Sequence, residues 1–164
     1  MTAETVWAGK FLSVVQDGRW EYVARTGSDG AVVIAAIDDD HLLLIEQHRI
    51  PAGRVCLELP AGLIGDEGGP ESAIAAGARE LEEETGYRAA TVVEMGSFYS
   101  SPGLTSESFT LVRATGLTLV GEPEAGIVVH RMVLSEVAAF VAAKRRAGLG
   151  IDAKLLLVLG AGLS

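Results

Sequence analysis

Cysteine is almost absent from this chain of 164 residues, where Cys56 is the only one. No disulfide can therefore form within the chain, and a reducing compartment, the cytoplasm, is the expected location. Cys56 lies in the apolar run Val55–Leu57, which is typical of a buried small side chain and not of a reactive thiol.

Long apolar runs and surplus positive charge are also missing. No secretory signal is recognised at the N-terminus, and apolar runs such as Leu155–Leu159 are far shorter than the ~20 residues of a membrane-spanning helix. The 13 Lys and Arg residues are outnumbered by 22 Asp and Glu, which gives a net charge of −9. We therefore expect neither a membrane nor a nucleic acid as partner, because a duplex-binding surface needs clustered Lys and Arg. An anionic small molecule would need a metal ion or locally placed arginines to bind here.

What the chain does contain is typical of a globular protein, with 49% hydrophobic and 21% charged residues. The first 29 residues are expected to form a β-rich piece of their own. Strands are predicted at Lys10–Val15 and Trp20–Arg25, joined by a turn at Gln16–Arg19 that contains the hairpin signal Asp-Gly. We place a boundary in the loop Gly27–Gly30, so that residues 1–29 are an N-terminal antiparallel β subdomain and residues 30–164 the main domain.

Strands and helices are mixed along the rest of the chain, which predicts the α/β class. Ala31–Ile37 is a continuous apolar run suited to a strand buried on both faces. A helix from Leu134 is expected to open on Ser135-Glu136 in the manner of a cap. The other expected strands are His41–Gln47, Cys56–Gly62, Thr91–Ser97, Ser108–Ala114 and Ile127–Val133, and the expected helices are Ser72–Thr85, Leu134–Arg146 and Asp152–Leu159.

The helix predicted at Ser72–Thr85 carries an unusual acidic face. Its Ala-rich sequence favours a helix, with acidic residues in the first turn, and Glu80, Glu83 and Glu84 lie at i, i+3 and i+4 on one side. Three carboxylates so placed repel one another by roughly 0.2–0.5 kcal/mol per pair. A divalent cation that prefers oxygen ligands, Mg²⁺ or Mn²⁺, would relieve that repulsion. A solvated acidic face on a surface helix is the plainer alternative.

The complete pattern around this helix decides between the two readings. Residues 65–87 match the Nudix box, G-x5-E-x7-R-E-U-x-E-E-x-G-U with U apolar, at every constrained position. These positions are Gly65, Glu71, Arg79, Glu80, Leu81, Glu83, Glu84, Gly86 and Tyr87. The chain therefore resembles a Nudix hydrolase. That resemblance implies an α/β/α sandwich with a mixed sheet, and metal-dependent cleavage of a nucleoside diphosphate linked to another moiety.

The same resemblance implies roles for the residues of the box. Glu80 and Glu84 are the principal metal ligands, and Glu83 is a ligand or orients a water molecule. Glu71 supports the loop before the helix, and Arg79 orients a carboxylate through an ion pair.

Residues 46–49 (Glu-Gln-His-Arg) and 58–62 (Glu-Leu-Pro-Ala-Gly) resemble a segment of the ADP-ribose pyrophosphatase, or ADP-sugar pyrophosphatase, branch of that family. The resemblance implies that Arg49 binds a phosphate, for which its fork of donors is well suited. It also implies that the backbone carbonyl of Ala61 is a metal ligand. Without that context, Arg49 is equally well read as a surface residue that follows a strand.

Residues 101–107 (Ser-Pro-Gly-Leu-Thr-Ser-Glu) are similar to a loop of the same branch. Pro102 lies 15 residues past Tyr87, the offset associated with ADP-ribose enzymes. Glu107 resembles the loop glutamate that serves as general base in relatives, and Glu83 is the alternative base. An ordinary turn with an exposed glutamate is the plainer interpretation of the loop.

The segment Trp20–Arg25 looks like the W-E-x-V-x-R segment of ADP-sugar pyrophosphatases. In relatives this N-terminal piece is exchanged between two subunits, which implies a homodimer. Phe11 and Trp20 would hold the adenine, since base stacking on aromatics is worth roughly 1–3 kcal/mol. Glu21 would accept a hydrogen bond from the adenine amino group and Arg25 would bind phosphate. A tryptophan packed in a β-hairpin is the alternative.

Two departures from the family pattern stand out. In many relatives one glycine both ends the Pro-Ala-Gly segment and begins the Nudix box, whereas here Gly62 and Gly65 are three residues apart, so the loop at residues 62–70 is longer. Residues 122–127 are also less acidic than their counterpart in many relatives. The main hypothesis is Mg²⁺-dependent hydrolysis of ADP-ribose to AMP and ribose 5-phosphate. GDP-mannose, another nucleotide sugar or an oxidised nucleotide is the rival substrate. A nucleotide-sensing module is the non-enzymatic rival, against which the intact acidic residues argue.

Overall fold

The computed structural model describes residues 3–27, 30–65 and 69–160. Part of the predicted boundary, residues 28–29, and part of the predicted long loop, residues 66–68, lie outside the described residues. None of the helices within the described ranges is both long and apolar enough to cross a membrane.

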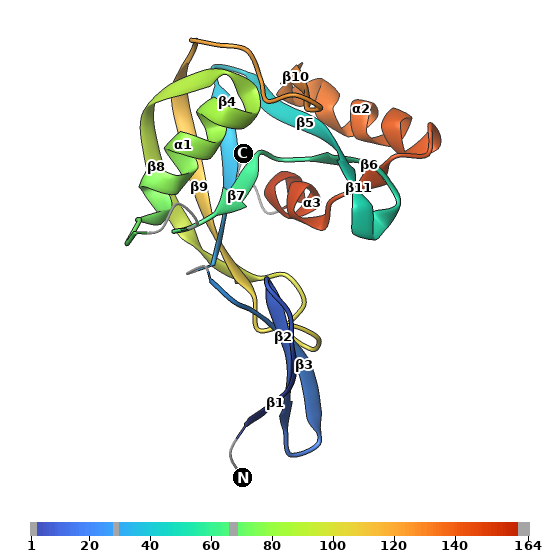
Figure 1. The fold of residues 1–164 in the computed structure, drawn as a ribbon. Coiled ribbons are helices and arrows are strands. Elements are labelled where there is room, and N and C mark those ends of the chain that lie inside the picture. Colours follow the sequence, from blue (N-terminus) through green and yellow to red (C-terminus); the bar gives the residue numbers. More distant parts are fainter. Residues whose placement is uncertain (1–2, 28–29, 66–68, 161–164) are drawn as a thin grey trace.

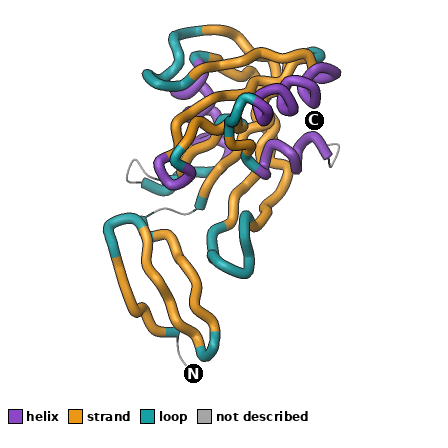
Figure 2. The backbone as a smooth tube through the Cα atoms, turned by 90° about the vertical axis from the view of Figure 1, so that its right-hand side faces the viewer, coloured by secondary structure: helices purple, strands orange, loops and turns teal. Residues whose placement is uncertain are grey.

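The N-terminal residues form a three-stranded antiparallel sheet that projects from the rest of the chain (Figures 1 and 2). Its strands are β1 (Glu4–Ala8), β2 (Leu12–Asp17) and β3 (Trp20–Arg25). The hairpin between β2 and β3 turns at Gly18-Arg19, where Gly18 has a φ of 60° that suits glycine. The hairpin was predicted, but β1 was not, because its five residues are exposed and carry no alternating pattern.

The main sheet is mixed and follows the order β11-β6-β5-β4-β9-β8, with β10 added beside β5 and β7 beside β4. The pairs β4–β9 and β11–β6 are parallel, and the other pairs are antiparallel. The strands are β4 (Ala31–Asp38), β5 (His41–Arg49), β6 (Arg54–Glu58), β7 (Ala61–Leu63), β8 (Tyr87–Tyr99), β9 (Ser108–Leu119), β10 (Val128–Val133) and β11 (Gly150–Ile151). The helices are α1 (Ala73–Thr85), α2 (Leu134–Arg146), α3 (Ala153–Gly160) and the short 3₁₀ helix η1 (Ile50–Ala52).

Helices cover both faces of this sheet (Figure 1). Strand β4 is buried on both sides because its residues alternate between two cores: Val33 and Ile37 pack in one and Val32 and Ile34 in the other. The first core includes α2 and α3, and the second includes α1. The predicted α/β/α sandwich with a mixed sheet is confirmed, as is the doubly buried strand.

The ends of the helices differ in part from those expected. Ser72 caps α1 by accepting a hydrogen bond from the Ala75 N–H at 3.2 Å, and Gly86 ends it with a φ of 74°. The expectation of acidic residues in the first turn of α1 is wrong, since Glu71 precedes the cap. The predicted helix cap at Ser135-Glu136 is also wrong. Helix α2 begins at Leu134 after Val133, which offers no side-chain cap.

Candidate active site

Two buried carboxylates of α1 lie directly against the backbone of β7. Glu80 and Glu84 are only 8% and 6% exposed. The Ala61 N–H donates to Glu84 Oε2 at 2.9 Å, and Gln47 Nε2 lies 3.4 Å from Glu84 Oε1. A Cβ atom on Gly62 would stand 1.9 Å from Cδ of Glu80. A residue without a side chain is therefore required at position 62 for the Glu80 carboxylate to approach the strand.

Burial is the largest cause that raises the pKa of Glu84, to about 7. The negative charge of Glu80 raises this pKa as well, and the hydrogen bond from Ala61 opposes both effects. At neutral pH a substantial fraction of Glu84 therefore retains its proton. A nearby cation would favour the ionised form, and an all-oxygen donor set of this kind suits Mg²⁺ or Mn²⁺.

Arg79 ties the box residues together. Its Nε lies 3.2 Å from Glu71 Oε1, and its Nη1 lies 2.9 Å from Glu80 Oε1 and 3.2 Å from Glu83 Oε2. Its Nη2 donates to the carbonyl of Leu63 in β7 at 3.1 Å. The predicted ion pairing of Arg79 with a carboxylate is thus confirmed.

Glu71 in turn accepts a hydrogen bond from the Gly65 N–H at 3.1 Å, so the predicted support of the preceding loop is confirmed. Glu80 and Glu83 share a helix face as the spacing predicted, but Arg79 bridges both of them. In the described part of the chain, no three acidic, histidine or cysteine side chains are gathered in a way that could hold a metal ion.

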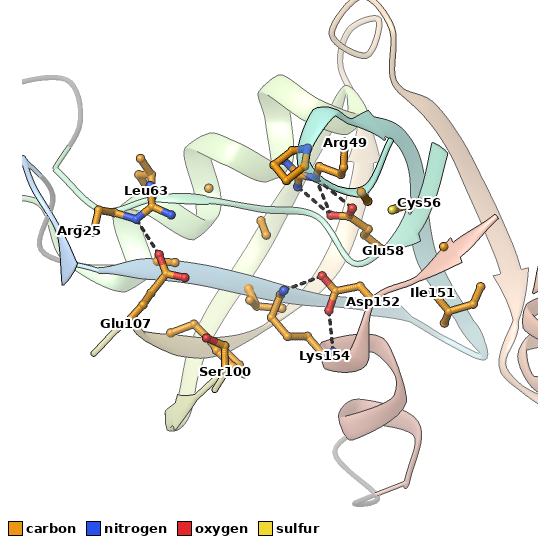
Figure 3. Close-up of a pocket in the computed structure, with 18 residues that line it drawn as sticks. Arg25, Arg49, Cys56, Glu58, Leu63, Ser100, Glu107, Ile151, Asp152 and Lys154 are labelled. Carbon is orange, nitrogen blue, oxygen red and sulfur yellow. Dashed lines mark hydrogen bonds and ion pairs between the residues drawn. The ribbon is translucent and has the colours of Figure 1, made fainter. Parts of the chain in front are cut away.

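A cleft of about 830 Å³ runs along β7, lined by Ala61, Gly62 and Leu63. Three ion pairs from separate parts of the chain project into it (Figure 3). They are Arg25–Glu107 at 2.6 Å, Arg49–Glu58 at 2.7 Å and Lys154–Asp152 at 2.5 Å. The backbone that contacts the buried carboxylates of α1 thus also lines a cleft with three cations.

The pair Arg25–Glu107 exists because β3 docks onto the loop that carries Glu107. The Val23 N–H donates to the Leu104 carbonyl at 2.9 Å, and the Ser106 N–H donates to the Val23 carbonyl at 3.0 Å. This pairing brings the predicted phosphate-binding arginine and the predicted general base together across 82 residues of sequence.

Arg49 donates to Glu58 through both Nε and Nη2, at 2.9 and 2.7 Å. These bonds raise the pKa of the Arg49 guanidinium, so it stays charged. They leave Nη1 outside the pair with Glu58, and the Arg49 side chain lines the same cleft. Sequence reasoning assigned no role to Glu58. In the sheet register Arg49 pairs with Arg54 and Glu58 with Ile45, so cross-strand spacing gave no signal for this ion pair.

The predicted base-binding residues Phe11, Trp20 and Glu21 are exposed and do not line this cleft. Trp20 lines a smaller cavity of about 310 Å³ together with Tyr22, Pro102, Gly103, Thr105 and Ser106. Phe11 lies at the other end of the hairpin, since Leu12 pairs with Arg25 and Asp17 with Trp20. Six residue steps separate Phe11 from Asp17, which lies opposite Trp20, so the two aromatics are about 20 Å apart along the hairpin. One hairpin alone therefore cannot stack both on the same base.

The described fold and box are those of a known family. The NUDIX domain model matches residues 28–146, and the chain belongs to the Nudix family. This confirms the resemblance drawn from residues 65–87.

Three similar proteins show how far this likeness extends. The ADP-ribose pyrophosphatase of Mycobacterium tuberculosis is 43% identical over 97 residues, 58% of this chain and 46% of that protein. The CMP-5'-(N-acetyl-N-hydroxy-3-aminopropyl)phosphonate hydrolase of Streptomyces rubellomurinus is 30% identical over 95% of this chain and 84% of its own. A crystal structure of an ADP compounds hydrolase matches with a TM-score of 0.67 and 26% identity, covering 87% of this chain and 81% of the other. The chain spans about half the length of several curated relatives that it matches, the Mycobacterium tuberculosis protein among them.

Proposed function

We propose that this protein hydrolyses the pyrophosphate bond of ADP-ribose to AMP and ribose 5-phosphate, using Mg²⁺ or Mn²⁺. Nudix hydrolases depend on divalent metal ions, and several similar proteins carry the name ADP-ribose pyrophosphatase. One observation carries the proposal: the Ala61-Gly62 backbone touches the buried carboxylates of α1 and lines the cleft that holds Arg25 and Arg49.

In this proposal Glu80 and Glu84 hold the metal, with Glu83 and the Ala61 carbonyl as further ligands. The metal, when bound, supplies a Lewis acid for a phosphoryl oxygen and lowers the pKa of a water molecule. Cation binding would also offset the cost of two buried negative charges side by side.

Arg25 and Arg49 bind the diphosphate in this proposal. Both line the cleft, and a guanidinium offers the paired donors that phosphate oxygens accept. Their present partners, Glu107 and Glu58, hold the two side chains in place before substrate arrives.

Glu107 is the general base in our proposal. Its carboxylate faces the cleft, and the Glu107 N–H donates to Thr105 Oγ1 at 3.1 Å, which braces the loop. Glu83, the alternative, has a half-exposed side chain bonded to Arg79 and does not line the cleft. A base must reach the reacting water within hydrogen-bond distance, so the geometry favours Glu107.

We further propose a homodimer in the cytoplasm with an exchanged N-terminal segment, residues 1–29, ahead of the catalytic domain at 30–164. Arg25 already lies in the cleft of its own subunit, so the exchange brings the aromatics of this segment, and not its Arg25, to the partner's site. The N-terminal sheet leaves large apolar side chains exposed, and such a patch marks an interaction surface. They are Val6, Trp7, Phe11, Leu12 and Trp20. In a two-fold assembly Phe11 and Trp20 could come from different hairpins, which resolves their separation within one hairpin. Glu21 would then accept a hydrogen bond from the adenine amino group.

Subunit exchange tests the dimer. A Trp20→Ala chain is mixed with a Glu84→Gln chain after each is shown to be folded. If each site uses one subunit's hairpin and the other's metal helix, a mixed dimer holds one intact site, and activity recovers well above either parent. No recovery after verified exchange would mean that the hairpin serves its own subunit.

A substrate panel with Mg²⁺ tests the activity. ADP-ribose, GDP-mannose, 8-oxo-dGTP and a CMP-linked phosphonate are compared at equal concentration, with products identified by chromatography. We expect AMP and ribose 5-phosphate from ADP-ribose at the highest kcat/KM. Glu84→Gln should abolish turnover, while Glu94→Gln, the same change at an exposed site on β8, should not. Preference for the CMP compound would follow the Streptomyces relative instead, and no turnover at all would favour a nucleotide-sensing module.

A further inference from the structure

The third ion pair of the cleft, Asp152–Lys154, has no role in the scheme above. Asp152 Oδ1 accepts from the backbone N–H of Lys154 at 2.7 Å, and Asp152 Oδ2 lies 2.5 Å from Lys154 Nζ. The Asp152 N–H is itself fixed to the Leu57 carbonyl of β6 at 3.1 Å. Both side chains line the cleft and are largely buried there, with 17% and 30% of their surfaces exposed.

The pair lies in the part of the cleft that is away from the hairpin. In Figure 3 the side chains of Asp152 and Lys154 point toward one another across from Arg49 and Glu58, while Arg25 and Glu107 lie at the opposite end. The charge of Asp152 contributes to the raised pKa of Arg49, so the two groups share one electrostatic environment. A diphosphate bound at Arg49 would therefore place its second substituent beside Asp152 and Lys154.

The chemistry of the pair fits hydroxyl groups better than a phosphate. Its two charges cancel, so it offers little net attraction to an anion. It does offer both kinds of hydrogen-bonding group side by side: carboxylate lone pairs that accept, and ammonium hydrogens that donate. A sugar hydroxyl donates and accepts at once, and two neighbouring hydroxyls can engage both members of such a pair.

We propose that Asp152 and Lys154 bind the hydroxyl groups of the sugar on the second phosphate, and so select nucleotide sugars over simpler diphosphate esters. This rests on the proposed hydrolysis of a nucleoside diphosphate in the same cleft. In this proposal the start of α3 determines which substrate is selected. Helix α1, Arg25 and Arg49 act on the diphosphate that all these substrates have in common.

Two substrates separate these contributions. ADP-ribose and the methyl ester of ADP carry the same base and diphosphate, but only ADP-ribose carries the second sugar. Asp152→Asn keeps a residue that caps a helix well while removing the carboxylate charge. Lys154→Met removes the ammonium group and keeps a long side chain, and Lys154→Arg restores the donor. Arg146→Met, on the exposed surface of α2, is the control with the same loss of one positive charge.

We expect Asp152→Asn and Lys154→Met each to lower kcat/KM for ADP-ribose about tenfold, mainly through KM. For the methyl ester the same variants should stay within about twofold of wild type. Lys154→Arg should recover part of the loss, and Arg146→Met should change neither substrate. Melting temperatures measured on the same samples identify any variant that fails through misfolding. Asp152→Asn should stay folded, because asparagine also caps a helix well.

Equal losses on both substrates, or none on ADP-ribose, would overturn the proposal. If wild type turns over another nucleotide sugar instead, the comparison is repeated with the methyl ester of that nucleoside diphosphate. If wild type cleaves no nucleotide sugar, the proposed hydrolysis is refuted, but the binding role of the pair is still open to test. Titration calorimetry of ADP-ribose against ADP methyl ester then decides the role of the pair, and equal affinities in wild type would reject it.

Discussion

The charge buried at Glu84 makes the stability of the metal-free protein depend on pH in a calculable way. The folded state holds the Glu84 proton up to a pKa of about 7, whereas the ordinary value is 4.5. Between these two values the unfolded chain loses a proton that the folded chain retains. The free energy of unfolding therefore falls as pH rises through this window, by about 3 kcal/mol in total.

Glu84→Gln should remove this dependence. The amide oxygen can still accept from the Ala61 N–H, and Gln47 can turn its own amide to match the new neighbour. At pH 8 in a chelator the variant should therefore unfold about 6–12 °C above wild type, since 1 kcal/mol corresponds to ~2–4 °C at this chain length. At pH 4.5 the two proteins should melt together.

Thermal unfolding followed by circular dichroism from pH 4.5 to 8.5, with and without Mg²⁺, measures this directly. Glu94→Gln serves as the control for the loss of one exposed carboxylate. Excess Mg²⁺ should stabilise wild type far more than Glu84→Gln, and the variant should keep less than about a tenth of wild-type kcat, a loss above ~1.4 kcal/mol. Melting curves of wild type and variant that run parallel at every pH would refute the reasoning.

Three further substitutions test the site. Gly62→Ala would push a methyl group into the Glu80 carboxylate, so we expect activity to fall at least tenfold and stability by ~1–3 kcal/mol, measured by turnover and melting. Glu107→Gln should lower kcat by roughly 10²–10⁴ with metal affinity unchanged, and an unaltered kcat would move the base to Glu83. Arg79→Met should cost about 2–3 kcal/mol of stability in urea unfolding, because it removes the guanidinium that bridges the part-buried carboxylates of Glu71 and Glu80; a wild-type midpoint would contradict that role.

Much of the site followed from short-range spacing. The acidic face of α1 follows from the 3.6-residue turn of a helix, and the β2–β3 hairpin was indicated by the Asp-Gly pair at the end of β2. The ties from Arg79 to its neighbours also lie within one short segment. Such features depend on residues a few positions apart, which a sequence displays directly.

Features that depend on the order of strands in the sheet could not be predicted from the sequence. The two-residue strand β11 exists only because it pairs with β6, and that pairing carries Asp152 into the cleft. Glu107 meets Arg25 because β3 docks on the loop before β9.

By itself, then, the sequence determined the family, the α/β/α sandwich and the acidic face of α1, because each follows from local periodicity or from a contiguous motif. Only the tertiary structure decided which distant groups meet. It placed Glu80 against Gly62 and paired Arg25 with Glu107, 82 residues away. The physical reason is that such contacts depend on strand order and register, which bring together residues far apart in the chain.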